Sequence, residues 1–382
     1  MPNDTILVLQ KNSNDTYVVG DIHGELEIFN KIVANLKQND TLVIVGDLID
    51  RGMDPKTNIP TTPDILDFII NNQNNPQKKI NIYSVAGNHE INFVRAMNIF
   101  LNKPNWNRND INELLILIIN GGRWIFDPLD NENIQDVLLH YETFRGKSAN
   151  SHEISPFQDT IVDYFNMIKE SPNKTIYFHP KIGEYIEFIE SLPLIIKIDA
   201  DNNPAWVVHA DLPYSDKNLE NMISKKLKFN LLAKLYITET REDIYQDNNR
   251  GKESNTITYC GHNIIRDSVI PVRENSLHVN LDFGMYYTHQ AILVNHTKGL
   301  TKGITREEFE LDEDEHNQDE EYIELLIATN SINEFLIKHR SIHDNNCSIS
   351  KMNNTLFGTP SAGKNPSIPC SQNLAESQNK LK

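Results

Sequence analysis

Residues 16–24 read TYVVGDIHG, residues 41–52 read TLVIVGDLIDRG and residues 81–90 read NIYSVAGNHE. Each segment is a short run rich in β-branched and other apolar residues that passes through a glycine into polar residues. Short apolar runs bounded in this way are typical of buried strands. Directly after the three predicted strands come side chains that can bind a metal ion or transfer a proton: Asp21, His23, Asp47, Asp50, Asn88 and His89.

Four later segments repeat the strand pattern, at residues 205–210, 256–261, 276–284 and 290–296. The first two are associated with single histidines, His209 and His262. Between the early strands, residues 26–36 and 65–70 are rich in apolar side chains and suit helices. This alternation predicts an α/β fold with central β-sheets flanked by helices. The carboxyl ends of parallel strands meet at one edge of a sheet, so we expect the polar side chains to gather there.

A helical insertion is predicted between the third and fourth strands, because residues 87–204 contain helical patterns alone. We therefore expect a catalytic domain at residues 1–310 that includes a helical insertion or cap at residues 90–204. An acidic segment with a C-terminal helix at residues 311–340 and a disordered tail at residues 341–382 should follow. The insertion either shapes the substrate entrance or only adds packing surface, and the sequence leaves both interpretations open.

The bulk composition describes a globular protein with an acidic surface. Of 382 residues, 39% are hydrophobic and 23% charged, and 36 basic against 53 acidic residues give a formal net charge of −17. That charge argues against a nucleic-acid partner, which normally needs a basic surface. It does not exclude an anionic substrate, because bound metal ions reverse the local field.

The cysteines and the hydropathy pattern bear on the compartment. Cys260, Cys347 and Cys370 are too few and too scattered for a disulfide framework, which favours a reducing compartment such as the cytoplasm. No apolar run approaches the roughly 20 residues that a membrane span needs. Export of the protein by a non-classical route into a host cell stays open.

The residue types after the strands suit a pair of divalent ions. Carboxylate, imidazole and amide oxygen are ligands for Mn²⁺, Fe²⁺ or Zn²⁺, and a set without cysteine suits exchangeable Mn²⁺ as much as Zn²⁺. Mn²⁺ is the favoured ion, with Fe and Zn as alternatives. Six such ligands are enough for two ions that share one bridging carboxylate. Two ions roughly 3.5–4 Å apart can hold a hydroxide and clamp a phosphoryl group for in-line attack.

The motifs GDIHG, GDLIDRG and GNHE, followed by two single histidines, resemble those of the phosphoprotein phosphatase family within the calcineurin-like metallophosphoesterases, in particular its bacterial-type members. The resemblance extends from about Tyr17 to His296, which is most of the expected folded chain. Three motifs in the same order make a chance match negligible. The resemblance implies the layered calcineurin-like fold and a hydrolase of phosphate esters.

The resemblance also implies a role for each motif residue. It assigns the first metal to Asp21 and His23, the bridging position to Asp47, and the second metal to Asn88, His209 and His262. It makes His89 the general acid that protonates the leaving oxygen, with Asp50 orienting its ring. It makes Arg51 a bidentate phosphate clamp, and a second arginine is expected at Arg241, with Arg250 as the competitor.

Two residues beside the predicted ligands need separate interpretation. Where the family has His-Gly-Gly or His-Ala-Gly, this chain has His209-Ala210-Asp211, which adds a carboxylate near the metal site. Asp211 is interpreted either as a modifier of substrate preference or rate or, preferably, as an acid in a surface loop. Cys260 is interpreted as a small buried residue rather than a redox switch.

The resemblance implies a metal-dependent phosphatase that hydrolyses phosphate monoesters by direct attack of a metal-bridging hydroxide. A phosphoprotein substrate is favoured, with phosphoserine and phosphothreonine preferred to phosphotyrosine, because the long insertion offers more surface than a small nucleotide needs. A bis(5′-nucleosyl) polyphosphate hydrolase is the alternative enzyme. A non-catalytic scaffold is the alternative from another class, and it would not need the intact acid, clamp and ligand residues.

Overall fold

The structure is a computed structural model, and it divides the chain into two units, Met1–Ser341 and Ile342–Lys382. All described residues lie in the first unit. They are residues 3–10, 13–57, 59–75, 77, 80–103, 105–126, 178–199, 203–212, 214–229, 256–265, 271–274, 277–306 and 323–339, with single residues between 163 and 170 and between 234 and 239.

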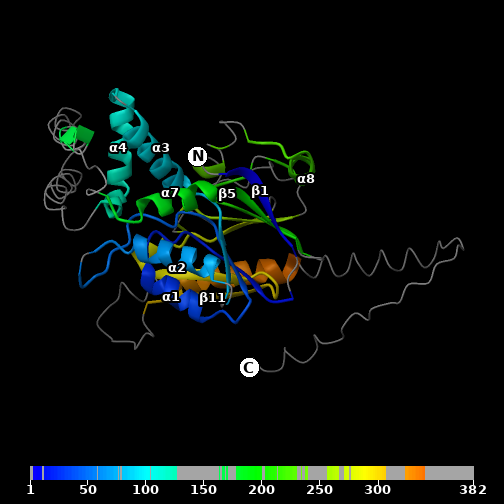
Figure 1. Ribbon diagram of the computed structural model, residues 1–382. Coiled ribbons are helices and arrows are strands. Elements are labelled where there is room, and N and C mark those ends of the chain that lie inside the picture. Colours follow the sequence, from blue (N-terminus) through cyan, green and yellow to red (C-terminus); the bar gives the residue numbers. More distant parts are fainter. Residues whose placement is uncertain are drawn as a thin grey trace, which may run out of the picture. The chain divides into compact units, whose positions relative to one another are not determined.

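Two β-sheets form the centre of this unit (Figure 1). The six-stranded sheet has the order β1 (Asn3–Leu9), β5 (Pro193–Ile198), β6 (Ala205–Val208), β7 (Ile257–Cys260), β9 (His278–Asn280), β8 (Val272–Arg273). The five-stranded sheet has the order β11 (Leu300–Thr305), β10 (Gln290–Asn295), β2 (Thr16–Val19), β3 (Thr41–Ile44), β4 (Asn81–Ser84). Within them β2, β3 and β4 are parallel, and so are β6, β7 and β9. The α/β class expected from the sequence is confirmed, with two mixed sheets.

The strands face two different hydrophobic cores because side chains alternate along a strand. Val18 and Val43 lie in one core together with Val207 and Tyr259 of the other sheet, so these faces of the two sheets pack against each other. Val19, the next residue along β2, lies instead in the core that contains the helices. The sheets therefore form inner layers, and helices cover their outer faces.

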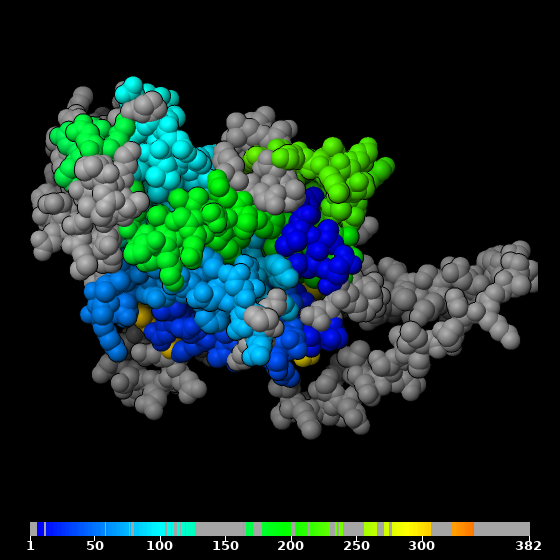
Figure 2. Space-filling view, in the orientation of Figure 1, coloured from blue at the N-terminus to red at the C-terminus, as the bar shows by residue number. Residues whose placement is uncertain are grey.

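The outer helices come from the segments with helical spacing, except α8, which was not expected. They are α1 (Leu26–Ala34), α2 (Thr62–Asn74), α3 (Asn88–Asn102), α4 (Arg108–Ile119), α7 (Ile182–Ser191) and α8 (Asp216–Lys225). Figure 2 shows α2 in light blue and α7 in green side by side on one face. They are joined by the Asp67 carboxylate, which accepts from Lys181 Nζ at 2.7 Å and from Tyr185 Oη at 3.0 Å.

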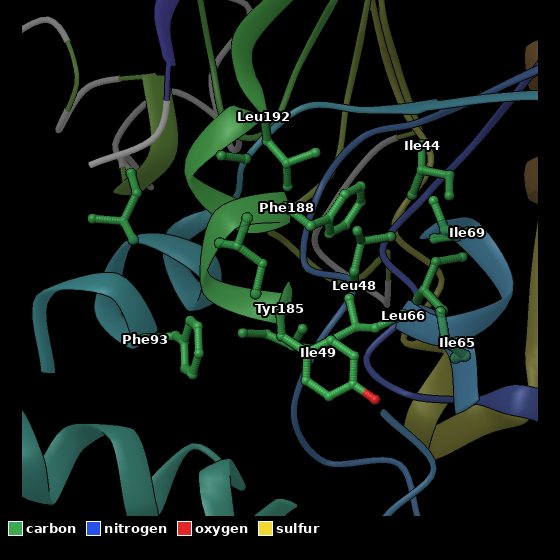
Figure 3. Packing of buried hydrophobic residues seen from close by; sticks show 14 of the residues in the cluster. Ile44, Leu48, Ile49, Ile65, Leu66, Ile69, Phe93, Tyr185, Phe188 and Leu192 are labelled. Carbon is green, nitrogen blue, oxygen red and sulfur yellow. The ribbon is translucent and has the colours of Figure 1, made fainter. Parts of the chain in front are cut away.

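The loop after β3 is held by the packing between these helices. Leu48 and Ile49 lie between Tyr185 and Phe188 of α7 and the apolar side chains of α2, such as Leu66 (Figure 3). All five are buried. The loop after β3 carries polar side chains, and its apolar residues Leu48 and Ile49 anchor it to the helices.

The expectation of helices alone between residues 87 and 204 is wrong at its end. Pro193–Ile198 is strand β5, which pairs in parallel with β1 and antiparallel with β6. Its sequence PLIIKI directly follows α7, and a short apolar run cannot be assigned to helix or strand by periodicity alone. Strands β1, β8 and β11 were not expected either. Residues 127–162 and 171–177 of the proposed insertion lie outside the described residues.

The predicted C-terminal helix is confirmed over residues 323–339, and Leu325, Ile332 and Leu336 place it against the core between the sheets. The acidic segment at residues 307–322 and the tail at residues 341–382 lie outside the described residues. Among the helices that the structure describes, none is long and apolar enough to cross a membrane.

Candidate active site

The loops that leave the strands carry unusual backbone conformations. φ is positive at His23 (47°), Asp47 (45°), Asp50 (72°), Arg51 (63°) and His262 (69°). A non-glycine residue in this region costs roughly 1–3 kcal/mol and persists only where the surroundings over-determine it, most often at functional sites. All five were singled out from the sequence, and they follow β2, β3 and β7, whose carboxyl ends face one another across the two sheets.

The carboxylate of Asp47 lies at the centre of the site. Its Oδ2 atom is 3.4 Å from His209 Nε2, 3.5 Å from His23 Nε2 and 3.9 Å from His89 Nε2. Burial opposes ionisation of Asp47, but the neighbouring histidines, with His209 first, lower its pKa. Two groups able to hold a metal ion share this residue: His23, Asp47 and His89, and Asp47, His209 and His262.

The second of these groups is completed by Asn88. His209 Nε2 lies 3.0 Å from Asn88 Oδ1 and 3.1 Å from His262 Nδ1. The other nitrogen of His209 is 3.0 Å from the carbonyl oxygen of Val45, which holds the ring in place and leaves Nε2 for a ligand. The side chains of His209 and His262, which follow β6 and β7, and of Asn88, the first residue of α3, therefore converge on one point beside Asp47.

Asp21 is buried, and its position fits a nearby cation. Oδ2 accepts from the backbone N–H of His262 at 3.0 Å, whereas Oδ1 accepts no hydrogen bond from the residues that the structure describes and lies 3.9 Å from His209 Nδ1. Burial, together with Asp282 and Asp47, raises the pKa of Asp21 well above its ordinary value. A buried oxygen without a donor, next to a second carboxylate, is stabilised in its ionised form by a metal ion.

Two motif glycines leave room for the carboxylates. A Cβ atom on Gly87 would lie 2.1 Å from Asp47 Oδ1, and one on Gly261 would lie 2.0 Å from Asp21 Oδ1. No larger residue fits at either position without moving a carboxylate. The absence of side chains here is therefore what allows the two aspartates to reach the centre of the site.

Glu90 holds the Asp47 loop, a role that the sequence did not indicate. Its carboxylate accepts from the backbone N–H groups of Gly87 (2.8 Å), Leu48 (2.8 Å) and Asp47 (3.0 Å). It is fully buried, and burial together with Asp47 raises its pKa to about 8. The glutamate of the GNHE motif was the available signal, because a glutamate at the third position of a helix can accept the backbone N–H of the N-cap residue, here Gly87 at the start of α3.

His89 and Asp50 form a buried pair. His89 Nδ1 lies 2.7 Å from Asp50 Oδ2, and the two side chains are 2% and 1% exposed. Burial lowers the pKa of His89, but the charges of Asp47 and Asp50 outweigh it, so the pKa is raised overall. The ring therefore binds Asp50 through Nδ1 and presents Nε2 on the side of Asp47.

Arg51 spans the two histidines on this side of the site. Nη1 is 3.2 Å from His23 Nε2 and Nη2 is 3.0 Å from His89 Nε2. The guanidinium also lies 4.4 Å from the ring centroid of Tyr286, and this half-buried ring packs edge-on against His23 at 5.2 Å. Tyr286, which no sequence motif singled out, therefore forms an aromatic wall for the arginine.

The interpretation of Asp211 as a surface acid is wrong. Its side chain is buried, with Oδ1 2.8 Å from His278 Nε2 and Oδ2 3.5 Å from Arg273 Nη1. Burial works against ionisation, but His278 and Arg273 lower its pKa. Cys260, at the end of β7, is buried as expected, and burial raises the pKa of its thiol to about 12. The predicted Arg241 and its competitor Arg250 lie outside the described residues.

Comparison with known proteins agrees with this geometry. The family model for the calcineurin-like phosphoesterases matches residues 16–213, a little over half of the chain. The chain belongs to the calcineurin-like phosphoesterase family. It is a metal-dependent phosphoesterase in which two buried groups of histidine and aspartate share one carboxylate, as suits a site for two metal ions.

Three similar solved structures are distant in sequence. One is of a candidate diadenosine tetraphosphatase, 16% identical, which covers 79% of this chain and 98% of its own, with a TM-score of 0.39. A metallophosphoesterase from Sphaerobacter thermophilus is 12% identical over 85% of this chain and 99% of its own, with a TM-score of 0.35. A hypothetical protein from Pyrococcus horikoshii OT3 is 11% identical over 84% and 97%, with a TM-score of 0.34. No curated protein matches the chain.

Proposed function

We propose that the calcineurin-like site of this chain hydrolyses phosphate monoesters and that its physiological substrate is a phosphoprotein, with phosphoserine and phosphothreonine preferred to phosphotyrosine. The observation that carries the proposal is the pairing of His89 with Asp50 beside Arg51 and Asp47. An acid, a phosphate-binding cation and a metal-binding carboxylate within one buried loop cluster are the parts that monoester hydrolysis needs.

The metal ligands in this proposal are Asp21 and His23 for the first ion, Asp47 between the two, and Asn88, His209 and His262 for the second. When bound, the two ions supply a water of lowered pKa as the nucleophile and offset the charge of the phosphoryl oxygens. His89 also lies within one of the two metal-binding groups, so its assignment as acid rather than ligand rests on its contact with Asp50.

The remaining steps belong to the protein side chains. Arg51 donates N–H groups from one planar guanidinium, which suits two oxygens of a phosphate, and Tyr286 limits how far it can move. His89, held through Nδ1 by Asp50, donates the proton on Nε2 to the ester oxygen as the P–O bond breaks. The products are an alcohol, which is the serine or threonine of the substrate in our proposal, and inorganic phosphate.

A substrate panel tests this function. Metal-loaded protein is assayed on phosphoserine, phosphothreonine and phosphotyrosine peptides and on dinucleoside polyphosphates, with Mn²⁺, Fe²⁺ and Zn²⁺ compared at equal concentration. We expect phosphate release from the phosphoserine and phosphothreonine peptides, with Mn²⁺ giving the highest rate, and loss of activity after chelation. A higher kcat/KM for dinucleoside polyphosphates would replace the proposal by the nucleotide hydrolase. Binding without turnover of any ester would favour a scaffold.

A further inference from the structure

A segment that follows the helical pair α3 and α4 contacts the loop that carries Asp50 and Arg51. The two helices lie side by side, shown in cyan in Figure 1, and α4 leads through Gly121 into the short helix η1 (Gly122–Ile125). Gly121 has φ +99°, and a Cβ atom on it would lie 2.5 Å from the backbone nitrogen of Arg51. The backbone of the segment therefore packs directly against the backbone of the Asp50 loop.

One side chain of this segment makes a hydrogen bond inside the site. The indole Nε1–H of Trp124 donates to Asp50 Oδ1 at 2.7 Å, while Asp50 Oδ2 binds His89 Nδ1 at 2.7 Å. Each carboxylate oxygen of Asp50 thus has one dedicated side-chain partner. Because both bonds are short and buried, rotation of the carboxylate would break the two together.

The indole itself is fixed by its neighbours. Trp124 is buried, its ring lies 5.1 Å from that of Phe93 on α3 and 6.0 Å from that of Tyr185 on α7, measured between centroids. The indole N–H of Trp124 is therefore a rigid donor from outside the motif loops, and it sets the plane of the Asp50 carboxylate. The backbone of Asp50 itself has positive φ. Asp50 alone could rotate about its Cβ–Cγ bond and leave the imidazole of His89 misaligned.

We propose that Trp124 is a positioning residue of this enzyme: its indole N–H orients the Asp50 carboxylate, and Asp50 in turn orients His89 toward the leaving oxygen. The inference rests on the proposed function for its catalytic consequence, although the contact itself does not. It also gives the region around α3 and α4 a role in catalysis beyond packing. The chain supplies its own control, because Trp206 Nε1 donates to Asp216 Oδ1 at 2.8 Å and Trp206 is as buried as Trp124.

The contact is tested first without any assay of activity. The chain has three tryptophans, so a ¹⁵N–¹H spectrum of its indole groups contains three side-chain resonances, assigned by Trp→Phe variants. Asp50→Asn replaces the charged acceptor, and we expect it to move the Trp124 indole resonance upfield and to leave that of Trp206 unchanged. An unmoved Trp124 resonance would overturn the proposal, even if Trp124→Phe failed to fold.

The catalytic role is tested with Trp124→Phe and Trp206→Phe, each with metal content measured. Trp124→Phe should lower kcat on a phosphoserine peptide about 10- to 100-fold, the effect of losing one hydrogen bond to a charged group. KM and metal content should stay unchanged, the defect should be smaller on p-nitrophenyl phosphate, and Trp124→Phe should add little in an Asp50→Asn background. Trp206→Phe should keep kcat within about twofold.

Two results would contradict the role: equal slowing of both esters by Trp124→Phe, or equal slowing of the peptide by the two tryptophan variants. Failure of the proposed function is distinguishable, because it would show as absent phosphate release by the unmodified protein. In that case the indole spectra still decide whether Trp124 holds Asp50.

Discussion

The two sheets contribute unlike halves to the site. The segments after β2, β3 and β4 carry the acid pair, the arginine and most of the carboxylates, and four of their non-glycine residues have positive φ. The ends of β6 and β7 contribute single histidines, His209 and His262, with His209 fully buried. In the first half, backbone N–H groups of the loop after β3 donate to the Glu90 carboxylate. In the second half, Asp211 lies two residues after His209 and pairs with His278.

This difference suggests a division of labour. The half after β2, β3 and β4 positions the groups that handle the phosphate and the proton, and the histidine half completes the metal ligands. Variants in the two halves should therefore separate metal content from rate.

The largest effect is expected for His209→Ala. It removes the side chain on which Asn88, His262 and Asp47 converge, so the second ion should be lost and, with it, the stabilisation of the phosphoryl charge. We expect metal content to fall by about half and activity to fall below detection, measured by elemental analysis and by phosphate release. Retention of both ions would show that the histidine half does not complete a metal site.

The next effect is expected for His89→Asn. If His89 is the acid, this variant should keep both ions and lose about 10²- to 10⁴-fold in kcat on phosphoserine peptides, the usual range for general acid catalysis. The loss should shrink for p-nitrophenyl phosphate, whose leaving group needs little protonation. Because His89 also belongs to one of the metal-binding groups, loss of metal in this variant would instead make it a ligand.

Asp211→Asn should affect stability more than rate. The asparagine would be neutral, so the buried charge of Arg273 and the ring of His278 would lose the attraction of the carboxylate, which should lower the free energy of unfolding by about 3 kcal/mol. With saturating metal, kcat should stay within a few-fold of the original, because Asp211 pairs with these side chains and not with the ligands. A loss in rate as large as that of His89→Asn would contradict the division between the halves.

The same carboxylate implies a pH dependence. Because its pKa is lower in the folded than in the unfolded protein, Asp211 contributes stability above its unfolded pKa of about 3.9, and this contribution is lost as the pH falls further. The unfolding free energies of the original protein and of Asp211→Asn should therefore converge in acid, as measured by denaturant titration. A constant difference across the acid range would show that charge is not the cause.

The smallest effect is expected for Cys260→Ala. The thiol lies at the end of β7, and with a pKa of about 12 it stays protonated and unreactive near neutral pH. We expect activity within about twofold and a stability loss of about 1 kcal/mol, the scale of one small buried group. Native-state alkylation followed by mass spectrometry should leave Cys260 unmodified. Rapid labelling would show that the histidine half opens more readily than its burial implies.

The sequence by itself determined the α/β class, most of the strands that lead into the site and the identity of most of the residues that meet around Asp47, although not Tyr286 or the role of Glu90. These features are local: a short apolar run, a glycine and a polar residue lie next to one another in the chain, and the parallel strands carry them to one edge. The glycines were readable only in part: Gly87 and Gly261 directly precede Asn88 and His262 in the chain, but the carboxylates that they accommodate belong to Asp47 and Asp21, which are distant in the sequence.

Only the tertiary structure decided which strands and side chains support those residues. β5 is a strand because β1, from the start of the sequence, pairs with it, and Asp211 is buried because Arg273 and His278 come from another strand pair. Trp124 reaches Asp50 from the far end of a helical pair. Such contacts join positions distant in sequence, and whether a polar side chain is solvated or buried with a partner depends on what packs against it, which no local pattern records.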